Sequence, residues 1–304
     1  MTSAVTLLWF ILQPLVLLAQ QKESALASVD YEFVHVNDTN NRDKPNKTNM
    51  RLYLGRQSSQ YINQTIAERR ERTEALLREQ GIGGVVSGVR MSIRQGGGGS
   101  GSGLEEIFLY PTLKKLLTID GISSTTYSIE QVYPELKWEI GQETKEIGGF
   151  TVQQARTFFA GRYYTAWFTP EIPFPLGPWK LHGLPGLILE AADDTGEVQF
   201  LYKDFVQLEE GDRSIELPEN VVTATPRQFD RAKAAYENNP NAANQSSIPA
   251  AGANQISQVL ITIDANGNRQ TLTGDEAKAE LERRQLQEKN SNNNPIEKEA
   301  VKNN

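Results

Sequence analysis

Most of the chain alternates apolar and polar positions with the period of a β-strand. Residues 29–36 (VDYEFVHV) place Val29, Tyr31, Phe33 and His35 on one side, the pattern of a strand with one buried face. The same kind of pattern, bounded by Gly, Pro, Asn and Asp turn signals, predicts further strands at 50–55, 59–62, 106–109, 115–120, 125–132 and 137–140. His35, on the buried side of its strand, is expected to be packed or hydrogen-bonded rather than a ligand.

Two longer runs complete the strand pattern. Residues 152–168 break near Gly161, and residues 187–205 turn near Asp194-Thr195-Gly196. Apolar and aromatic side chains occupy both parities of 158–168, which predicts that both faces of this strand are covered. Successive short strands joined by short connections predict an antiparallel meandering sheet.

Helical signals are fewer than strand signals. Residues 65–80 carry a Thr-x-x-Glu start and helix-spaced charges, and Thr225-Pro226 begins a second helix that runs to about residue 237. A third helix is expected from Thr273 to about residue 289, after a hairpin around Asn266-Gly267. The predicted fold is therefore mainly β, a curved antiparallel sheet with two or three peripheral helices.

Residues 169–186 separate the two long runs and contain five of the chain's 14 prolines. Proline fixes the backbone angle φ and removes a hydrogen-bond donor, so this segment is neither a helix nor a central strand. It is also too aromatic for a flexible linker. We predict an ordered loop that folds over the sheet.

Composition shifts divide the chain into regions. Residues 1–20 carry no charged side chain and have the apolar core of a signal peptide, and residues 81–103 hold ten of the 24 glycines, which predicts a flexible insertion. The predicted organisation is a signal peptide (1–20), a first β part with a helix (28–80), the insertion (81–103), the core of the β domain (104–210), an extension of helix, linker, hairpin and helix (221–289) and a disordered tail (290–304).

Charge and residue usage exclude several classes of protein. A net charge of −7 argues against nucleic-acid binding, and the absence of cysteine leaves no disulfide, no thiolate metal site and no lipoprotein attachment. Only two histidines occur, and no residue set is typical of a zinc or haem site. We expect no cofactor and no metal, and a periplasmic or secreted location.

One long stretch carries a family resemblance. The residues GRYYTAWFTPEIPFPLGPWKLHGLPGLILEA resemble the signature of the GLPGLI family, exported proteins of Gram-negative bacteria whose function is unknown. Upstream, Trp138, Thr144-Lys145 and residues 147–150 also fit the family pattern. Within the hexapeptide Gly183, Leu184, Pro185, Gly186, Leu187 and Ile188, the glycines and the proline are best explained by backbone geometry, a tight turn into the next strand.

Aromatic and cationic residues in and beside the Pro-rich loop are candidate binding residues. They are Arg162, Tyr164, Trp167, Phe174, Trp179 and His182. Such a set could line a cleft for an apolar or peptide-like ligand, although the same aromatics could instead form the protein core. This interpretation favours a non-enzymatic binding or accessory protein that serves a periplasmic or outer-membrane partner.

Two alternatives stay open. An envelope hydrolase would use a carboxylate pair formed by Glu190 with Asp193 or Asp194, and it requires the two acids to converge in one pocket. The competing explanation of Asp193-Asp194-Thr195-Gly196 is simple turn chemistry. A purely structural interaction module would instead show an exposed apolar patch or an open sheet edge.

Overall fold

The computed structural model describes residues 22–79, 106–122, 125–218, 220–238, 259–263, 269–273, 279, 283 and 292–298. The fold is mainly β, with 51% strand and 13% helix, and its large sheet is not closed into a barrel. The fold class predicted from the alternation pattern is confirmed. In the described part of the chain, no helix is both long enough and apolar enough to cross a membrane.

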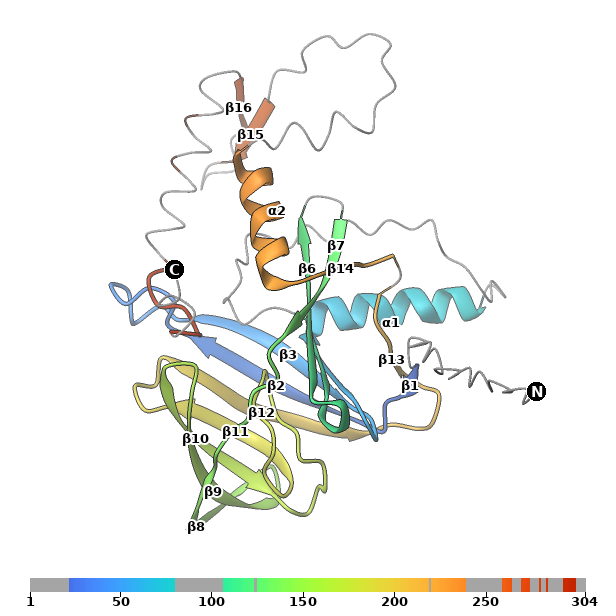
Figure 1. The fold of residues 1–304 in the computed structure, drawn as a ribbon, viewed down its shortest axis with the longest axis vertical. Helices are drawn as coiled ribbons and strands as arrows, with labels where there is room; N and C mark the ends of the chain where they lie inside the picture. The colour runs from blue at the N-terminus through green and yellow to red at the C-terminus, as the bar shows by residue number, and fades with distance from the viewer. Residues whose placement is uncertain are drawn as a thin grey trace, which may run out of the picture.

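Twelve strands form the main sheet (Figure 1). In chain order they are β2 (Ala27–His35), β3 (Asn46–Leu54), β4 (Ser59–Asn63), β5 (Glu106–Tyr110), β6 (Lys115–Ile122), β7 (Thr125–Gln131), β8 (Glu139–Ile147), β9 (Phe150–Phe159), β10 (Arg162–Thr169), β11 (Leu187–Asp193), β12 (Val198–Gln207) and β14 (Val222–Ala224). Two short pairs lie apart from this sheet, β1 (Glu23–Ser24) with β13 (Ser214–Ile215), and β15 (Val259–Ile263) with β16 (Arg269–Thr273).

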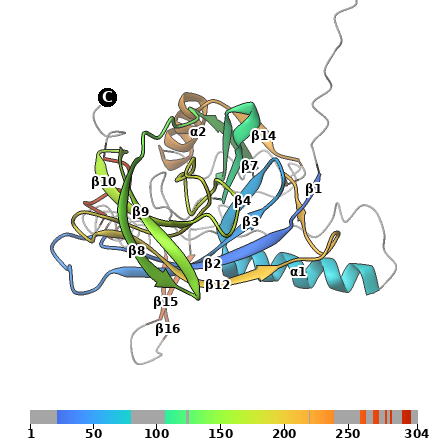
Figure 2. The ribbon, with the colours of Figure 1, turned by 90° about the horizontal axis from the view of Figure 1, so that it is seen from below.

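The main sheet is built from two antiparallel meanders. Strands β2 to β7 follow one another in space, as do β8 to β12, and the two meanders join where β12 pairs antiparallel with β2. β14 adds a parallel edge beside β7, so the sheet is mixed. Viewed from below, the strands curve around the interior of the molecule (Figure 2). The predicted antiparallel meander is therefore the organising feature of the sheet.

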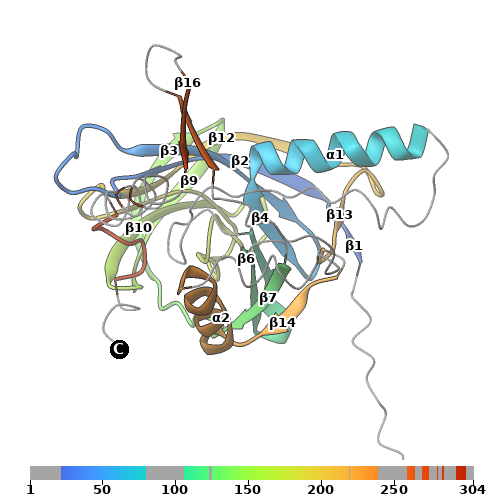
Figure 3. The same cartoon turned by 90° about the horizontal axis from the view of Figure 1, so that it is seen from above.

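Two α-helices of the described chain lie at the periphery (Figure 3). α1 (Gln64–Glu79) begins after Asn63, whose side-chain oxygen accepts the main-chain N–H of Thr65, so the cap is Asn63 rather than Thr65 as the sequence pattern predicted. α2 (Pro226–Asn238) has the expected capping box, because Thr225 and Gln228 exchange hydrogen bonds.

Most strand predictions agree with the structure, with one clear exception. β8 begins at Glu139 and runs to Ile147, whereas the pattern predicted a strand at 137–140. The prediction failed because β8 is an edge strand whose side chains are mostly exposed, so it lacks the alternation of a half-buried strand. The predicted signal peptide and glycine-rich insertion lie outside the described residues, as does almost all of the third expected helix.

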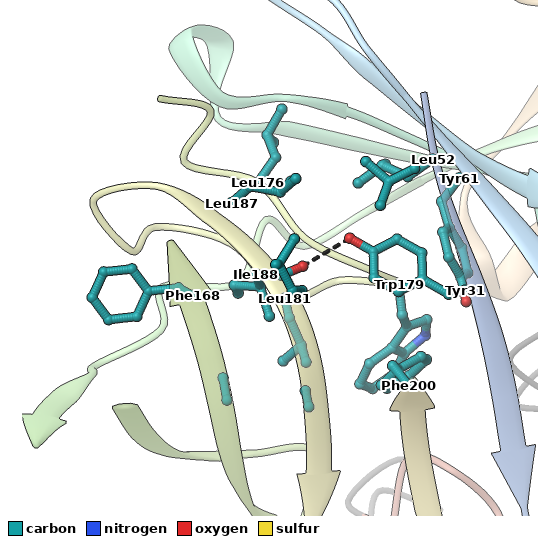
Figure 4. Packing of buried hydrophobic residues seen from close by; sticks show 14 of the residues in the cluster. Tyr31, Leu52, Tyr61, Phe168, Leu176, Trp179, Leu181, Leu187, Ile188 and Phe200 are labelled. Carbon is teal, nitrogen blue, oxygen red and sulfur yellow. Dashed lines mark hydrogen bonds between the residues drawn. The ribbon is translucent and has the colours of Figure 1, made fainter. Parts of the chain in front are cut away.

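The Pro-rich loop fills the interior of the curved sheet. Trp179 is 2% exposed, and its ring stacks on Phe200 of β12 with centroids 6.2 Å apart. Figure 4 shows this ring beside Tyr31, whose hydroxyl donates a 2.7 Å hydrogen bond to the carbonyl of Ile188. The loop is therefore ordered, as predicted, and it forms part of the core.

The expectation that both faces of 158–168 are covered is wrong. Arg162, Tyr164 and Phe168 point inward with the loop, but Phe158 and Tyr163 on the outer face remain 52% and 53% exposed. The loop packs on the same face as the rest of the core. This segment therefore has aromatic side chains on both faces, but only one face is buried, and the aromatic side chains of the other face are exposed.

The tail was expected to be disordered from 290 to 304, but residues 292–298 pack against the ends of the strands (Figure 1). Asn294 and Ile296 are 4% and 0% exposed. The composition of the tail is polar, yet the side chains of Ile296 and Asn294 are buried. We call residues 292–298 the C-terminal strap.

The hexapeptide turn imposes a strict steric constraint. Gly186 has a φ of +150°, and a Cβ atom there would lie 2.0 Å from the carbonyl oxygen of Thr169. Gly183 also has a positive φ, of +91°. The prediction that these glycines serve backbone geometry is consistent with both observations.

Gly186→Ala is therefore expected to destabilise the fold by at least about 3 kcal/mol, because strain and a backbone clash act together. Gly121→Ala is the control, since its Cβ would meet nothing closer than 3.7 Å. Urea denaturation of the two variants measures the difference. Equal midpoints would contradict this account of the turn.

Candidate functional site

Arg162 is the centre of a buried polar cluster where four adjacent strands end or begin. Its side chain is 2% exposed. On the sheet side, Nη1 donates to Asp193 Oδ2 at 2.6 Å and to Glu197 Oε2 at 3.1 Å. Asp193 ends β11 and Glu197 precedes β12, so a single turn supplies both carboxylates.

That turn is held independently of the strap. Asp193 Oδ1 accepts the main-chain N–H of Val198 at 2.9 Å, and Asp193 Oδ2 also accepts the hydroxyl of Thr195 at 2.6 Å. Gly196 adopts the positive φ of +67° that the turn requires. The expected turn chemistry of this segment is therefore present, and it has the further effect of fixing the carboxylates that orient Arg162.

The remaining donors of Arg162 face the C-terminal strap. Nη2 donates to Asn294 Oδ1 at 2.7 Å and to the carbonyl of Pro295 at 3.0 Å, and Nε donates to the carbonyl of Ile296 at 3.2 Å. A guanidinium group has five N–H donors. Arg162 therefore uses two on the sheet and three on consecutive residues of the strap.

Main-chain hydrogen bonds fix the strap at both ends. The N–H of Asn294 donates to the carbonyl of Asn37 at 3.1 Å, and the N–H of Lys298 donates to the carbonyl of Ala160 at 2.9 Å. His35 Nε2 lies 2.8 Å from the carbonyl oxygen of Asn294, and because a carbonyl only accepts, Nε2 carries the proton. The strap thus bridges the β2–β3 and β9–β10 connections.

Two strap side chains enter the protein beside Arg162. Ile296 belongs to the main hydrophobic cluster. The neighbouring Glu297 accepts a 2.5 Å hydrogen bond from Lys180, whose side chain is 5% exposed and also donates to Gln131. Lys180 lies next to Trp179 in the Pro-rich loop, so the strap contacts both the sheet and the loop.

Glu197 remains a carboxylate in this setting. Burial would raise its pKa, but hydrogen bonds from Arg162, Arg42 and Asn294 outweigh burial and lower the pKa to about 2. The charged form is thus stabilised by donors from the sheet, a loop and the strap. Burial lowers the pKa of His35, and the positive charge of Arg162 acts in the same direction.

The structure separates the six predicted binding residues. Arg162 lies in the polar cluster, whereas Tyr164 and Trp179 are core residues with rings 6.2 Å apart. Trp167 lies on the opposite face of β10, where Lys145 Nζ sits 4.4 Å above its ring. Phe174 is partly buried against the core. Of the five rings in this set, Tyr164, Trp179 and His182 are buried and contribute to the interior, whereas Trp167 and Phe174 are partly exposed.

His182 has a structural setting. Its carbonyl accepts the indole N–H of Trp138 at 2.8 Å, and its Nδ1 lies 3.3 Å from the hydroxyl of Tyr133. Burial lowers its pKa to about 4, although a hydrogen bond to the main chain of Pro134 acts in the opposite direction. His182 thus ties the Pro-rich loop to the segment between β7 and β8 as a neutral side chain.

The carboxylates of the hydrolase alternative do not converge as that alternative requires. Glu190 pairs with Lys145 on the outer face of β11, whereas Asp193 is buried with Arg162 on the inner face. Asp194 is exposed and pairs with Arg156. Each acid has a different cation as its partner. Among the described residues, no group of three or more His, Asp or Glu side chains could hold a metal ion.

Sequence reasoning missed most of the residues around Arg162. Glu197, Asn294 and Ile296 were not singled out. The one available signal was the isolated Ile296, the single large apolar residue in the polar stretch 290–298. Its burial depends on contacts more than one hundred residues away along the chain, such as that between Ile296 and Arg162, which a local pattern does not encode.

The fold and the site together define an open, mainly β protein that holds its own C-terminal strap at the ends of its strands. A family model described as "Protein of unknown function (Porph_ging)" matches residues 159–190. This short match overlaps the stretch on which the resemblance rests, and it does not confirm the GLPGLI name. None of the curated proteins matches the chain.

Two of the solved structures that match the chain do so with TM-scores below 0.5. The chain is similar to "Structure of PNGF-II in P21 space group" with a TM-score of 0.46 and 12% identity, covering 70% of this chain and 33% of that one. It is similar to "Structure of PNGF-II in C2 space group" with a TM-score of 0.44 and 11% identity, covering 67% and 32%. The chain thus spans about a third of the length of these structures.

Histidine burial predicts a pH-dependent stability. Unfolded His182 binds a proton near the ordinary pKa of 6.5, but the folded residue does so only near about 4. Because the unfolded state binds more protons in this window, the free energy of unfolding falls as the pH drops below 6.5. We expect a loss of about 2–3 kcal/mol from His182 by pH 4.5.

Urea denaturation at pH 7 and pH 4.5 measures this loss, with His182→Gln as the matched variant. The variant should show a smaller decrease, and the remainder should include the contribution of His35, whose pKa is also lowered. An equal decrease in both proteins would contradict the assignment to His182.

Proposed function

We propose that this protein is an exported, non-enzymatic binding or accessory protein of the cell envelope, and that it recognises a peptide segment at the Arg162 site. One observation carries the proposal. Three of the five guanidinium donors of a buried arginine are directed at consecutive residues of the C-terminal strap. The strap occupies this site from within the same chain.

The protein side of the site is organised before any peptide binds. Asp193 and Glu197 fix Arg162 from the β11–β12 turn, and Thr195 and the N–H of Val198 fix Asp193. A site whose donors are already oriented loses little conformational entropy on binding. If the strap leaves, three donors of Arg162 lose their acceptors and the Lys180 ammonium loses the Glu297 carboxylate, which favours replacement by a similar segment.

Export is supported by the signal-like residues 1–20. The proposed partner is then a periplasmic or outer-membrane protein that presents a peptide segment. The proposal requires the protein to be recovered in the periplasmic or membrane fraction of its native host. A non-enzymatic role is supported by the pairing of Glu190, Asp193 and Asp194 with three different cations.

A second candidate function has one specific observation in its favour. Phe158 and Tyr163 are both about half exposed on the outer face, with ring centroids 4.9 Å apart, and Arg156 lies 5.0 Å from the Tyr163 ring. Among the described strands, β8 is also the last of the main sheet and pairs only with β9. These features suit an interaction module that uses the outer face rather than the strap site.

The first candidate predicts that the strap can be exchanged. A protease recognition sequence introduced within residues 280–288 of the full-length protein allows the strap to be cut from the rest of the chain after folding. A fluorescent peptide with the sequence of residues 292–298 (NNNPIEK) should then enter the site. Fluorescence anisotropy should rise with saturable binding, and unlabelled peptide should reverse the rise.

The uncut protein is the control, because its strap stays tethered at a high effective concentration and should exclude the labelled peptide. Circular dichroism before and after cutting verifies that the fold persists. If the cut protein keeps its fold but takes up no peptide, the strap is a permanent part of the fold and the peptide-binding proposal is wrong.

A further inference from the structure

We infer that the Arg162 site selects its ligand through a buried asparagine carboxamide, and that it takes peptides of the type Asn-Pro-aliphatic-acidic. This inference rests on the proposed function, since it names the ligand chemistry of the same site. The strap residues Asn294, Pro295, Ile296 and Glu297 are the occupant from which the chemistry is read.

The carboxamide of Asn294 meets complementary groups on both of its ends. Its Nδ2 donates to the carbonyl of Val36 at 2.7 Å and to Glu197 Oε2 at 3.0 Å. Its Oδ1 accepts from Arg162 Nη2 at 2.7 Å. Two acceptors opposite the NH₂ group and one donor opposite the oxygen determine the orientation of the amide.

This arrangement rejects aspartate at the same position. An aspartate has the same shape, but it would place a carboxylate oxygen against the carboxylate of Glu197 and the carbonyl of Val36, both of which only accept. Burial strengthens this repulsion because Glu197 and Val36 are shielded from water. Sites built to hydrogen-bond a buried group reject analogues that leave their polar atoms unpaired.

The proline and the aliphatic residue fit the next two positions. The carbonyl of Pro295 accepts from Arg162, and proline needs no partner for a main-chain N–H, which it lacks. Proline also restricts the preceding residue to extended conformations, which reduces the entropy lost on binding. Ile296 is fully buried in the main cluster, so an aliphatic side chain is required there.

Lys180 favours an acidic residue at the position of Glu297. Its ammonium is 2.5 Å from Glu297 Oε1 and is almost completely buried. When the strap leaves, Gln131 still accepts one hydrogen bond from this ammonium, but its charge loses the Glu297 carboxylate. An acidic residue directly after the aliphatic one restores the pairing.

The test uses the cut full-length protein and a panel of labelled seven-residue peptides. The parent sequence is NNNPIEK, and the decisive change is Asn294→Asp in the peptide. We expect it to bind at least about 100-fold more weakly than the parent. Peptides with Ile296→Ala or Glu297→Gln should also bind more weakly, the former by at least about 30-fold.

Asn292→Asp is the matched control, because it makes the same chemical change two residues away. Asn292 is exposed, and its Oδ1 accepts from Asn37, a role that an aspartate oxygen keeps. We expect this peptide to bind within about 3-fold of the parent, as is usual for surface changes.

The outcomes separate this inference from the proposed function. If the parent peptide binds but Asn294→Asp and Asn292→Asp weaken binding equally, the site binds peptides without reading the carboxamide and the inference is overturned. If no peptide enters a folded, cut protein, the proposed function itself fails.

The intact chain gives a second test should the cut protein unfold. Asn294→Asp introduced into the uncut protein should lower the melting temperature clearly more than Asn292→Asp does. Equal melting temperatures of these two variants would overturn the inference.

Discussion

The structure depends on one buried guanidinium group. Arg162 is shielded from water, and a buried charge that loses its partners is strongly destabilising. Asp193 and Glu197 neutralise it from the β11–β12 turn, and the C-terminal strap takes the donors that remain. The strap supplies only uncharged groups to Arg162. The charge of the guanidinium is therefore neutralised without the strap. The strap therefore accepts the hydrogen bonds that Arg162 does not make within the sheet, as a bound ligand would.

The Pro-rich loop determines why the site lies at this end of the sheet. Trp179 packs inside the curve and adopts a φ of +56°, a strained conformation for a large side chain. The adjacent Lys180 is thereby held at the strap, where it pairs with Glu297. The interior of the sheet is thus filled by the loop, and the strap packs at the strand ends. A single stretch of sequence builds both the core and one wall of the site.

Local patterns predicted the fold well because sheets and turns have short-range signals. Alternation identified the strands from β2 to β7, prolines identified the loop, and Asp193-Asp194-Thr195-Gly196 identified a turn. Of the residues in the Arg162 cluster, the sequence pointed to Arg162 itself and to Asp193, the latter as an acid of the hydrolase alternative. The aromatic candidates proved to be mainly core or outer-face residues. The strap could not be predicted, because Asn294 and Ile296 are buried by partners distant in sequence. Polar composition alone indicated disorder there.

Hydrogen exchange in the strap is the most direct test of the central claim, that residues 292–298 are bound by Arg162. In the intact protein, the main-chain amides of Asn294 and Lys298 should exchange at least about 100-fold more slowly than in a free peptide. In Arg162→Gln this protection should be lost while the amides of β5 and β6 stay protected. Free-peptide exchange in the wild type, or unchanged strap protection in the variant, would contradict the account.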